Sequence, residues 1–277
     1  MTTQRVIKAL TVAGSDSGGG AGIQADLKTF AALGVYGSSV VTAVTAQNTL
    51  EVAAIAEVPE EVVIAQIDTV VHDIGADAAK TGMLGSIPII QNVADRLEAW
   101  GIPHLVVDPV MVSKGGVALI QDNAVEALKK DLLPFATVIT PNIPEAEVLA
   151  NRQIASPAHA QEASKAIAAL GPGTVIIKGG HLPGSPTDLV YHDGQFIPFE
   201  GTRIDTKNTH GTGCTFSAAI TAFLAYGFET LEAIRLAKTY IQNALEQSVT
   251  IGEGHSPVNH FAPLPEDIRT ALEGVRK

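Results

Sequence analysis

The chain has 277 residues, of which 46% are hydrophobic and 17% charged, a balance that predicts a large buried core and excludes a disordered chain. Because 29 acidic residues outnumber 18 basic ones, the net charge of −11 excludes non-specific binding to nucleic acids or anionic membranes. One small local phosphate site stays compatible with that charge. The single cysteine excludes a disulfide framework and a zinc site made of several cysteines.

Along the chain, short apolar runs typical of strands alternate with longer runs of helical spacing. The predicted order is strand 9–13, helix 21–33, strand 39–44, helix 59–73, strand 78–81, helix 88–100, strand 104–108, helix 122–132, strand 136–140, helices 144–150 and 157–170, strand 173–178, strands 188–191 and 195–199, and helices 211–226 and 230–249. Asp193 and Gly194 form a strong hairpin signal between the last two strands. The tail from Gly252 is expected to be mostly loop.

This alternation predicts an α/β fold with a mostly parallel sheet and helices on both faces, in one domain over residues 1–277. The hairpin is expected to add antiparallel edge strands and a small lid. Ligands of such sheets bind beyond the carboxyl ends of the strands, so the residues that follow each strand are the candidates for a site.

The amino-terminal segment indicates no targeting signal. Its first apolar run is short and is interrupted by Gly14 and Asp16, which favours a first strand over a signal peptide. No run approaches the roughly 20 apolar residues of a membrane helix. We therefore expect a soluble, cytoplasmic protein that acts on small molecules.

A glycine-rich loop follows the first predicted strand. Five of the nine residues 14–22 are glycine, which lets the backbone turn tightly and present its amides to a ligand. The loop is not a Walker loop, because no Gly-Lys-Ser/Thr follows. A flexible turn without a ligand is the alternative.

Side chains that carry oxygen follow two further predicted strands. Asp108 follows one of them, and Asn142 and Glu145 follow the next. Such oxygens can hold the water shell of Mg²⁺, which prefers oxygen ligands. In the alternative reading, Asn142 caps the next helix and Glu145 complements its dipole.

The segment DTKNTHGTGCTFSAA, residues 205–219, carries the strongest signal for an anion site. Gly211 and Gly213 leave consecutive backbone N–H groups exposed at the start of a helix, where the dipole also favours negative charge. Cys214 falls in the first turn, where a thiolate is stabilised, so we expect its pKa below the ordinary value of about 8.5. A capped helix followed by a small buried cysteine is the alternative.

These segments resemble those of a known enzyme family. The runs AGSDSGGGAGIQADLKTF, KTGML, DPVM, ITPNIPEAE, KGGH and DTKNTHGTGCTFSAA are similar to the hydroxymethylpyrimidine and phosphomethylpyrimidine kinases of thiamine biosynthesis, from about residue 10 to residue 261. The resemblance implies a ribokinase-like three-layer sandwich, a homodimer, and ATP and Mg²⁺ as cofactors. It also implies transfer of the ATP γ-phosphate to the 5-hydroxymethyl group of an aminopyrimidine, and then a second transfer to the monophosphate.

The same resemblance implies roles for individual residues. Gly211, Thr212 and Gly213 would form the anion hole for the transferring phosphoryl group, and Cys214 takes the place of the aspartate base of related sugar kinases. The other implied groups are Glu145, Asn142 and Asp108 for Mg²⁺ through water, Lys178, Asp108, Thr209 and Asn142 for the phosphates of ATP, and Gln47, Asp26, Gly14, Met83 and Val110 for the pyrimidine pocket.

Two alternative functions stay open. Some family members phosphorylate vitamin B6 alcohols, and Gln47 is the discriminating residue, because its amide suits the amino group and ring nitrogen of an aminopyrimidine. Gln47 could instead only close the turn after its strand. A non-catalytic sensor would lack the base, the carboxylates or the anion hole, and the sequence keeps all of them.

Overall fold

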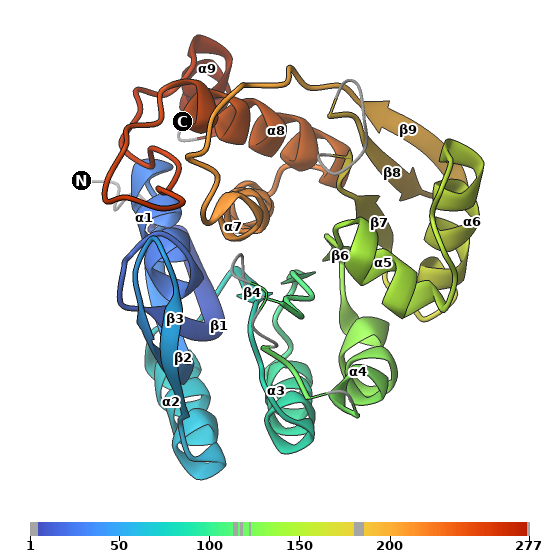
Figure 1. Ribbon diagram of the computed structural model, residues 1–277. Coiled ribbons are helices and arrows are strands. Elements are labelled where there is room, and N and C mark those ends of the chain that lie inside the picture. Colours follow the sequence, from blue (N-terminus) through green and yellow to red (C-terminus); the bar gives the residue numbers. More distant parts are fainter. Residues whose placement is uncertain (1–4, 113–115, 117–118, 122, 180–185, 276–277) are drawn as a thin grey trace.

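The computed structural model describes residues 5–112, 116, 119–121, 123–179 and 186–275, so Gly180 and His181 of the KGGH run lie outside the described residues. The described strands form one sheet in the order β3-β2-β1-β4-β5-β6-β7-β8-β9 (Figure 1). Their bounds are β1 Lys8–Asp16, β2 Tyr36–Gln47, β3 Val52–Glu57, β4 Ala78–Thr81, β5 Leu105–Val107, β6 Val138–Ile139, β7 Thr174–Ile177, β8 Asp188–His192 and β9 Gln195–Phe199.

The middle of the sheet is parallel and its two ends are antiparallel. Strands β2, β1, β4, β5, β6 and β7 run in one direction, while β3 pairs antiparallel with β2, and β8 and β9 continue antiparallel from β7. The predicted hairpin is confirmed, and Asp193 and Gly194 turn it with φ of 47° and 78°. The hairpin extends the sheet instead of forming a separate lid. Its outer strand, β9, contains Pro198, a residue that edge strands tolerate.

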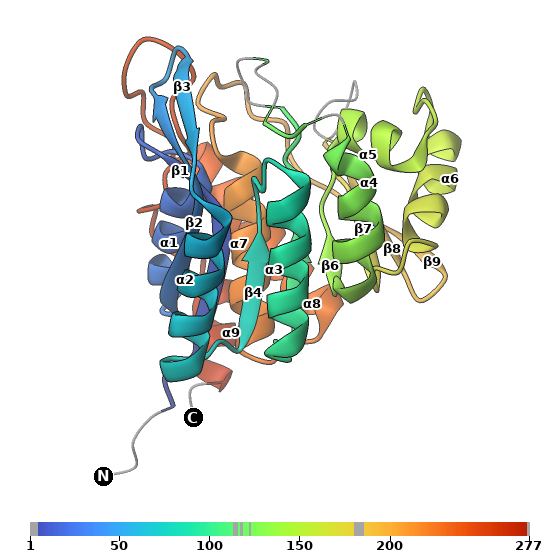
Figure 2. The ribbon, with the colours of Figure 1, turned by 90° about the horizontal axis from the view of Figure 1, so that it is seen from below.

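Helices cover both faces of the sheet and complete three layers (Figures 1 and 2). One face carries α1 (Gly22–Ala32), α7 (Thr212–Ala225), α8 (Thr230–Glu246) and α9 (Glu266–Val275). The other carries α2 (Glu60–Asp73), α3 (Ile87–Ala99), α4 (Ala124–Ala127), α5 (Ile143–Ala150) and α6 (Pro157–Ala168), most of which lie in front of the sheet in Figure 2. No helix among the described residues is long and apolar enough to cross a bilayer.

Successive strand residues alternate between two hydrophobic cores, one on each face. In β1, Leu10 and Val12 belong to the core under α2 and α3, whereas Ala9 belongs to the core under α7 and α8. The same alternation separates Val106 from its neighbours Leu105 and Val107 in β5. Because the strands are buried on both faces, their sequences read as continuous apolar runs.

Three segments differ from the sequence prediction. Strand β3 was not predicted, because its alanine-rich sequence is a weak strand signal and pairing with β2 holds it in place. The predicted helix 122–132 is α4 followed by a π-helical turn, Leu128–Leu132, and residue 122 lies outside the described residues. The tail is loop over residues 252–265, as expected, but then forms α9, which was not predicted and which buries Ile268 and Leu272 four residues apart on one face.

The strand order places a switch point between β1 and β4. From β1 the chain continues to β2 on one side, and it returns to β4 on the other side. The connections on the two sides therefore diverge at the carboxyl end of β1, which is where parallel sheets form ligand crevices.

Candidate active site

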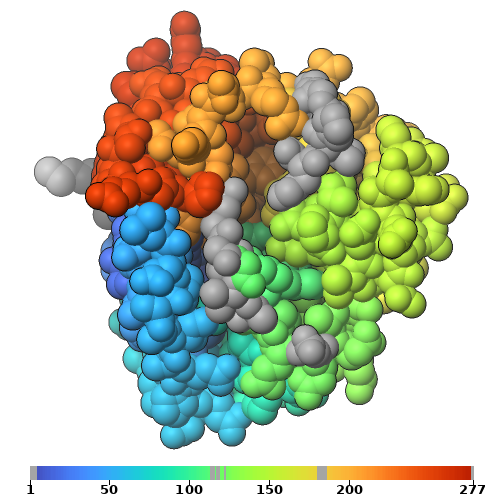
Figure 3. All heavy atoms as spheres, in the orientation of Figure 1, coloured from blue at the N-terminus to red at the C-terminus, as the bar shows by residue number. Residues whose placement is uncertain are grey.

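A cavity of about 960 Å³ opens at the carboxyl ends of the parallel strands. Figure 3 shows this hollow near the middle of one face, between the orange carboxy-terminal segments and the green segments. Its volume is that of a site for small molecules. The predicted residues that line it are Gly14, Gln47, Met83, Asp108, Val110, Asn142, Glu145, Lys178, Thr209, Gly211, Thr212, Gly213 and Cys214.

The start of α7 forms the wall that suits an anion. Gly211 precedes the helix with a φ of 74°, and a Cβ at this position would lie 1.8 Å from the carbonyl oxygen of Gly20, so only glycine fits. Within the described residues, no side chain caps this helix start. The first N–H groups of the helix, including those of Gly213 and Cys214, therefore have no partner inside the helix. With the positive end of the helix dipole, they favour a bound anion.

Lys178, which follows β7, places a positive charge beside this helix start. A Cβ on Gly213 would lie 3.4 Å from Lys178 Nζ, so the bare glycine lets the lysine approach the helix closely. Lys178 Nζ donates to Asp108 Oδ1 at 3.2 Å and lies 4.0 Å from Glu145 Oε2. Burial opposes the charged form, but the carboxylates of Asp108 and Glu145 raise the pKa of Lys178 and keep it protonated.

Asn142 and Glu145 together cap helix α5. Asn142 Oδ1 accepts the N–H of Glu145 at 2.9 Å, and Glu145 Oε2 accepts the N–H of Asn142 at 2.8 Å. This reciprocal pair is a capping box, so the alternative reading of Asn142 as a helix cap is confirmed. Glu145, expected in that reading only to complement the helix dipole, also takes part in the cap. Burial raises the pKa of Glu145 against the opposing effect of Lys178.

The carboxylates of the cavity do not form a direct metal cage. Among the described residues, no group of three or more His, Cys, Asp or Glu side chains is placed to hold a metal ion. Lys178 already lies within 4.0 Å of both Asp108 and Glu145, and the cap occupies the side-chain oxygen of Asn142. The donor set fits a Mg²⁺ that keeps its waters and enters with phosphates, because carboxylates can accept hydrogen bonds from those waters.

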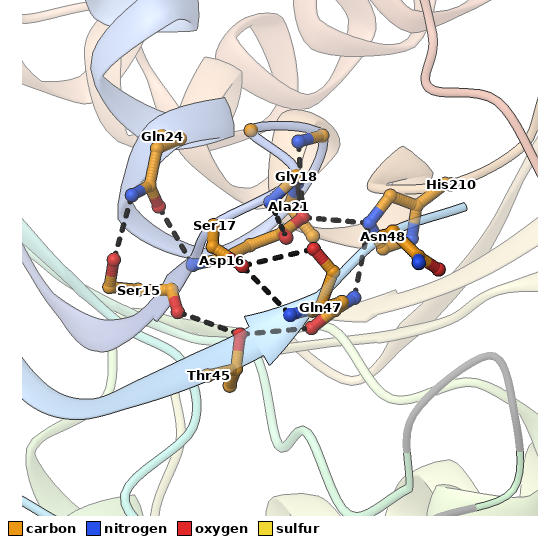
Figure 4. A network of polar contacts seen from close by, with 12 residues as sticks. Ser15, Asp16, Ser17, Gly18, Ala21, Gln24, Thr45, Gln47, Asn48 and His210 are labelled. Atoms are coloured by element: carbon orange, nitrogen blue, oxygen red, sulfur yellow. Dashed lines mark hydrogen bonds and ion pairs between the residues drawn. The ribbon is translucent and has the colours of Figure 1, made fainter. Parts of the chain in front are cut away.

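The glycine loop after β1 is built around Asp16 (Figure 4). The Asp16 carboxylate accepts the N–H groups of Gly18, Gly20 and Ala21 at 2.8, 3.0 and 2.8 Å, and its backbone carbonyl accepts that of Gly19 at 2.9 Å. The prediction that these amides face a ligand is therefore wrong, because Asp16 binds them. The loop is a rigid wall of the cavity.

His210, in the loop before α7, contacts both Asp16 and Gln47. Its Nε2 lies 2.8 Å from Asp16 Oδ2 and 3.3 Å from the amide nitrogen of Gln47 (Figure 4). Burial would raise the pKa of Asp16, but His210 and the loop N–H groups lower it below its usual range. The backbone of Gln47 closes a turn onto Ser17 Oγ, while its side chain lines the cavity.

Met83 and Val110 form apolar parts of the cavity wall. A Cβ on Gly14 would lie 3.1 Å from the sulfur of Met83, so the methionine packs directly on the glycine. Thr42 Oγ1 fixes this segment by donating to the carbonyl oxygen of Met83 at 2.6 Å. A flat ring can lie against such a surface, because it is apolar and close to the backbone.

A second lysine, Lys80 in β4, also lines the cavity and was not predicted. Its Nζ lies 2.9 Å from both carboxylate oxygens of Asp26, and Thr11 Oγ1 donates to the same carboxylate at 2.6 Å. Asp26 is absent from the described residues that line the cavity, so its predicted place in the pocket is wrong: its side chain is fully buried against Lys80. A lysine inside a buried four-residue strand was the available signal, because a buried charge needs a partner.

Cys214 lies in the cavity wall with a partly exposed side chain. Burial raises the pKa of its thiol to about 11, and the neighbouring charge of Lys80 and the N–H of Gly22 oppose that rise only in part. The prediction of a lowered pKa is therefore wrong, because desolvation outweighs the effects of Lys80 and the N–H of Gly22. At neutral pH the thiol is protonated.

Known proteins resemble this chain over nearly its whole length. The phosphomethylpyrimidine kinase family matches residues 16–259. The hydroxymethylpyrimidine/phosphomethylpyrimidine kinase of Haemophilus influenzae is 49% identical over 93% of this chain and 97% of its own length, and that of Bacillus subtilis is 47% identical over 93% and 96%. The crystal structure of an ADP complex of Bacillus subtilis pyridoxal kinase has a TM-score of 0.87 and 41% identity, covering 93% of this chain and 98% of that one.

These similarities define the class of protein as a kinase with a ribokinase-like fold, which confirms the predicted fold class. The chain belongs to the phosphomethylpyrimidine kinase family. The family expected from the sequence motifs is thereby confirmed.

Proposed function

We propose that this chain transfers the γ-phosphate of ATP to the hydroxymethyl group of 4-amino-5-hydroxymethyl-2-methylpyrimidine, and then phosphorylates the monophosphate to the diphosphate for thiamine diphosphate biosynthesis. The observation that carries the proposal is that one cavity joins the uncapped start of α7, beside Lys178, to the amide of Gln47. The first end suits phosphates, and the second suits a ring that carries an amino group. The names of the relatives from Haemophilus influenzae and Bacillus subtilis support the same substrates.

Phosphoryl transfer depends mainly on position and charge, with little covalent chemistry for the protein to perform. In the proposal, the N–H groups of Gly213 and Cys214 bind the oxygens of the transferring phosphoryl group, with Gly211 as the turn that exposes them. The N–H of Thr212, which was also expected to contribute, donates to the carbonyl oxygen of Thr209 at 3.3 Å. Lys178 neutralises their developing charge, and Asp108 orients the lysine by accepting its hydrogen bond at 3.2 Å. Thr209, near the end of the loop that leads into α7, completes the phosphate side of the cavity.

Cys214 acts in the proposal as a neutral thiol. Because burial raises its pKa to about 11, the thiol carries its own proton at neutral pH and does not readily accept another from the substrate. It can donate its S–H to an oxygen of the reacting group. The proton of the acceptor hydroxyl then passes to an oxygen of the transferred phosphoryl group.

Mg²⁺ belongs to the proposal as an ion that arrives with ATP. When bound, it neutralises phosphate charge, as divalent metals do in kinases. Asp108 and Glu145 would hold its waters, and Asn142 would contribute by fixing Glu145 through the capping box.

Pyridoxal phosphorylation is the second candidate function. The specific observation in its favour is the TM-score of 0.87 to a pyridoxal kinase of Bacillus subtilis. The amide of Gln47 in the cavity wall favours the aminopyrimidine, because it offers both a donor and an acceptor to the ring edge.

The proposal also includes a homodimer located in the cytoplasm. Apolar side chains are exposed on both faces of the β2–β3 end of the sheet, where Val44 is 50% exposed on one face and Ile55 is 36% exposed on the other. Mass measurement of the purified protein by light scattering tests the dimer, and fractionation of the source cells tests the location.

The substrate is tested by measuring ADP release with the aminopyrimidine alcohol, its monophosphate and pyridoxal. We expect the highest kcat/KM with the two pyrimidines; a higher value for pyridoxal would overturn the substrate assignment. Gln47→Met should lower kcat/KM for the pyrimidines about 5- to 150-fold and affect pyridoxal less, because a hydrogen-bonding partner in the pocket wall is lost. Gln161→Met, at an exposed position on α6, is the matched control and should change neither value.

A further inference from the structure

Three side chains meet at a single ring nitrogen at the pyrimidine end of the cavity (Figure 4). His210 Nε2 lies 2.8 Å from Asp16 Oδ2, and the amide group of Gln47 lies 3.3 Å from the same nitrogen. The Asp16 and His210 side chains are only 4% and 11% exposed, so water has little access to replace the hydrogen bonds between them. The position of one hydrogen atom therefore decides how the three groups bind.

The carboxylate of Asp16 decides where that hydrogen lies. An ionised carboxylate only accepts hydrogen bonds, so the contact at 2.8 Å requires a hydrogen on His210 Nε2. A protonated Nε2 has no lone pair left to accept a hydrogen bond from an amide NH₂ group. This holds for the neutral Nε2–H tautomer and for the imidazolium alike, because both carry a hydrogen on Nε2.

Gln47 must therefore turn its amide oxygen, and not its NH₂ group, toward His210. The two ends of an amide have the same shape, so their partners decide which end is which. At the other end of the amide lies the hydroxyl of Thr45, at 3.3 Å. Thr45 Oγ1 donates its own hydrogen to the carbonyl oxygen of Ser15 at 2.9 Å, so its lone pairs can accept a hydrogen bond from the NH₂ group. In this orientation the single Nε2 hydrogen is shared between Asp16 Oδ2 and the Gln47 amide oxygen, and the NH₂ group has an acceptor in Thr45. The opposite orientation would set two donors, the NH₂ group and the Nε2 hydrogen, against each other.

The ring of His210 is held firmly in this position. A Cβ on Gly20 would lie 2.5 Å from His210 Cδ2 and 2.9 Å from Pro257 Cβ, so the ring packs directly on the glycine. The backbone of His210 donates to the carbonyl of Ser256 at 3.1 Å and accepts from the N–H of Val258 at 3.3 Å. A ring fixed by both packing and backbone can hold its partner in one orientation.

We infer that His210 is a specificity-determining residue that acts through Gln47: with Asp16 behind it, it fixes the Gln47 amide with its oxygen toward the imidazole and its NH₂ group toward Thr45. One amide N–H and one oxygen lone pair then remain for a ligand, in a fixed order along the cavity wall. An aminopyrimidine matches that order, because its ring nitrogen accepts a hydrogen bond and its adjacent amino group donates one. The inference rests on the proposed function in that the aminopyrimidine is the ring that Gln47 reads.

The hydrogen on His210 can be observed without any substrate. In ¹⁵N-labelled protein, the histidine ring correlations should show a protonated Nε2 for the residue whose signal disappears in His210→Phe. An unprotonated Nε2 at neutral pH would overturn the inference, because the amide NH₂ group could then face the ring. This measurement stays decisive even if the protein phosphorylates no aminopyrimidine, an outcome that would end the proposed function alone.

Kinetics test the effect on specificity. His210→Phe keeps a ring but removes the donor, and should lower kcat/KM for the aminopyrimidine roughly 5- to 150-fold, mainly through KM, with a smaller loss for pyridoxal. His210→Gln restores an NH₂ donor toward Asp16 and should recover most of the preference. His72→Phe, at an exposed position on α2, is the matched control and should leave both substrates unchanged.

A double variant separates this role from general support of the fold. If His210 acts through Gln47, His210→Phe should lose little further aminopyrimidine preference in a protein that already carries Gln47→Met, because coupled residues are not additive. Full additivity of the two losses would overturn the inference. Equal losses for aminopyrimidine and pyridoxal in His210→Phe alone would also overturn it, and would make His210 a structural residue.

Discussion

Two of the lysine–carboxylate pairs at this cavity, Lys80 with Asp26 and Lys178 with Asp108, are built differently. Lys80 and Asp26 are both 0% exposed, and the lysine lies 2.9 Å from each oxygen of its partner. Lys178 is 18% exposed and donates to one oxygen of Asp108 at 3.2 Å. In the first pair the lysine binds both oxygens of its partner and neither side chain is exposed, whereas the second lysine binds one oxygen of its partner and keeps exposed surface for a ligand. A cation in a pocket is thus available for binding only when its own protein leaves it incompletely paired.

The fully buried pair, Lys80 with Asp26, should matter most for stability. Lys80→Met leaves the carboxylate of Asp26 buried without a cation, and breaking a buried pair in this way costs about 3–5 kcal/mol in free energy of unfolding. Urea denaturation measures the loss. Lys80→Met combined with Asp26→Leu should recover most of it, because apolar replacement of both partners is often neutral. A stable single variant would show that the two groups are not paired as ions.

The open pair should matter most for turnover. Lys178→Met removes a donor at the phosphate end, and we expect kcat to fall roughly 10²- to 10³-fold, the usual effect of losing one preorganised donor. The loss of stability should be smaller than that of Lys80→Met. Lys130→Met, at an exposed position, is the control and should keep full activity. An unchanged kcat in Lys178→Met would contradict the view that this lysine is the one available to a ligand.

Titration of the Cys214 thiol tests how burial and the charged groups around it set its pKa. With its pKa raised to about 11, the thiol should show no thiolate absorbance near pH 9, where the urea-unfolded chain should already be titrating. That difference corresponds to about a 100-fold lower thiolate fraction in the folded protein. Subtracting the absorbance of Cys214→Ala isolates the signal. A titration midpoint below about 8.5 in the folded protein would contradict the raised pKa and support the lowered pKa predicted from the sequence.

The same shift predicts how stability changes with pH. The folded pKa of Cys214 lies above the unfolded value, so its contribution is fully present below about pH 8.5 and is lost as the pH rises through about 11. Cys214→Ala should lose less stability over this range.

If the thiol is a donor and not a base, kcat of Cys214→Ala should fall less than about 10-fold, because every backbone N–H remains. A fall of about 10²–10⁴ would identify a base.

At Glu145, which shares Lys178 with Asp108, the effect is expected on the Mg²⁺ requirement. Glu145→Gln keeps an oxygen for the capping box but removes the charge, so the fold should stay intact. The Mg²⁺ concentration needed for half-maximal rate should rise roughly 10- to 100-fold, as for residues that hold a metal indirectly. Identical Mg²⁺ titration curves in wild type and variant would leave Glu145 with the helix cap alone.

Sequence patterns predicted the alternating elements well, and strand Ala78–Thr81 agrees at both ends. The site lies at strand ends and a helix start, which glycines and polar residues mark in the sequence. Contacts between distant segments could not be read in this way. The partners Lys80 and Asp26 are 54 residues apart and meet only after β1, β4 and α1 have packed. The raised pKa of Cys214 has the same origin, because a helix dipole is local whereas desolvation depends on the surrounding elements.

The antiparallel ends of the sheet leave its two edges unequal. At one end, Pro198 interrupts the outer row of backbone donors on β9, which is one way in which proteins block the addition of a foreign strand. At the other end, β3 has no proline, and its alanine-rich sequence leaves most of its side chains exposed. Strand addition by another chain, whether in an orderly assembly or during aggregation, should therefore begin at β3. A single proline or lysine placed in β3 would be the economical way to make the protein resist aggregation.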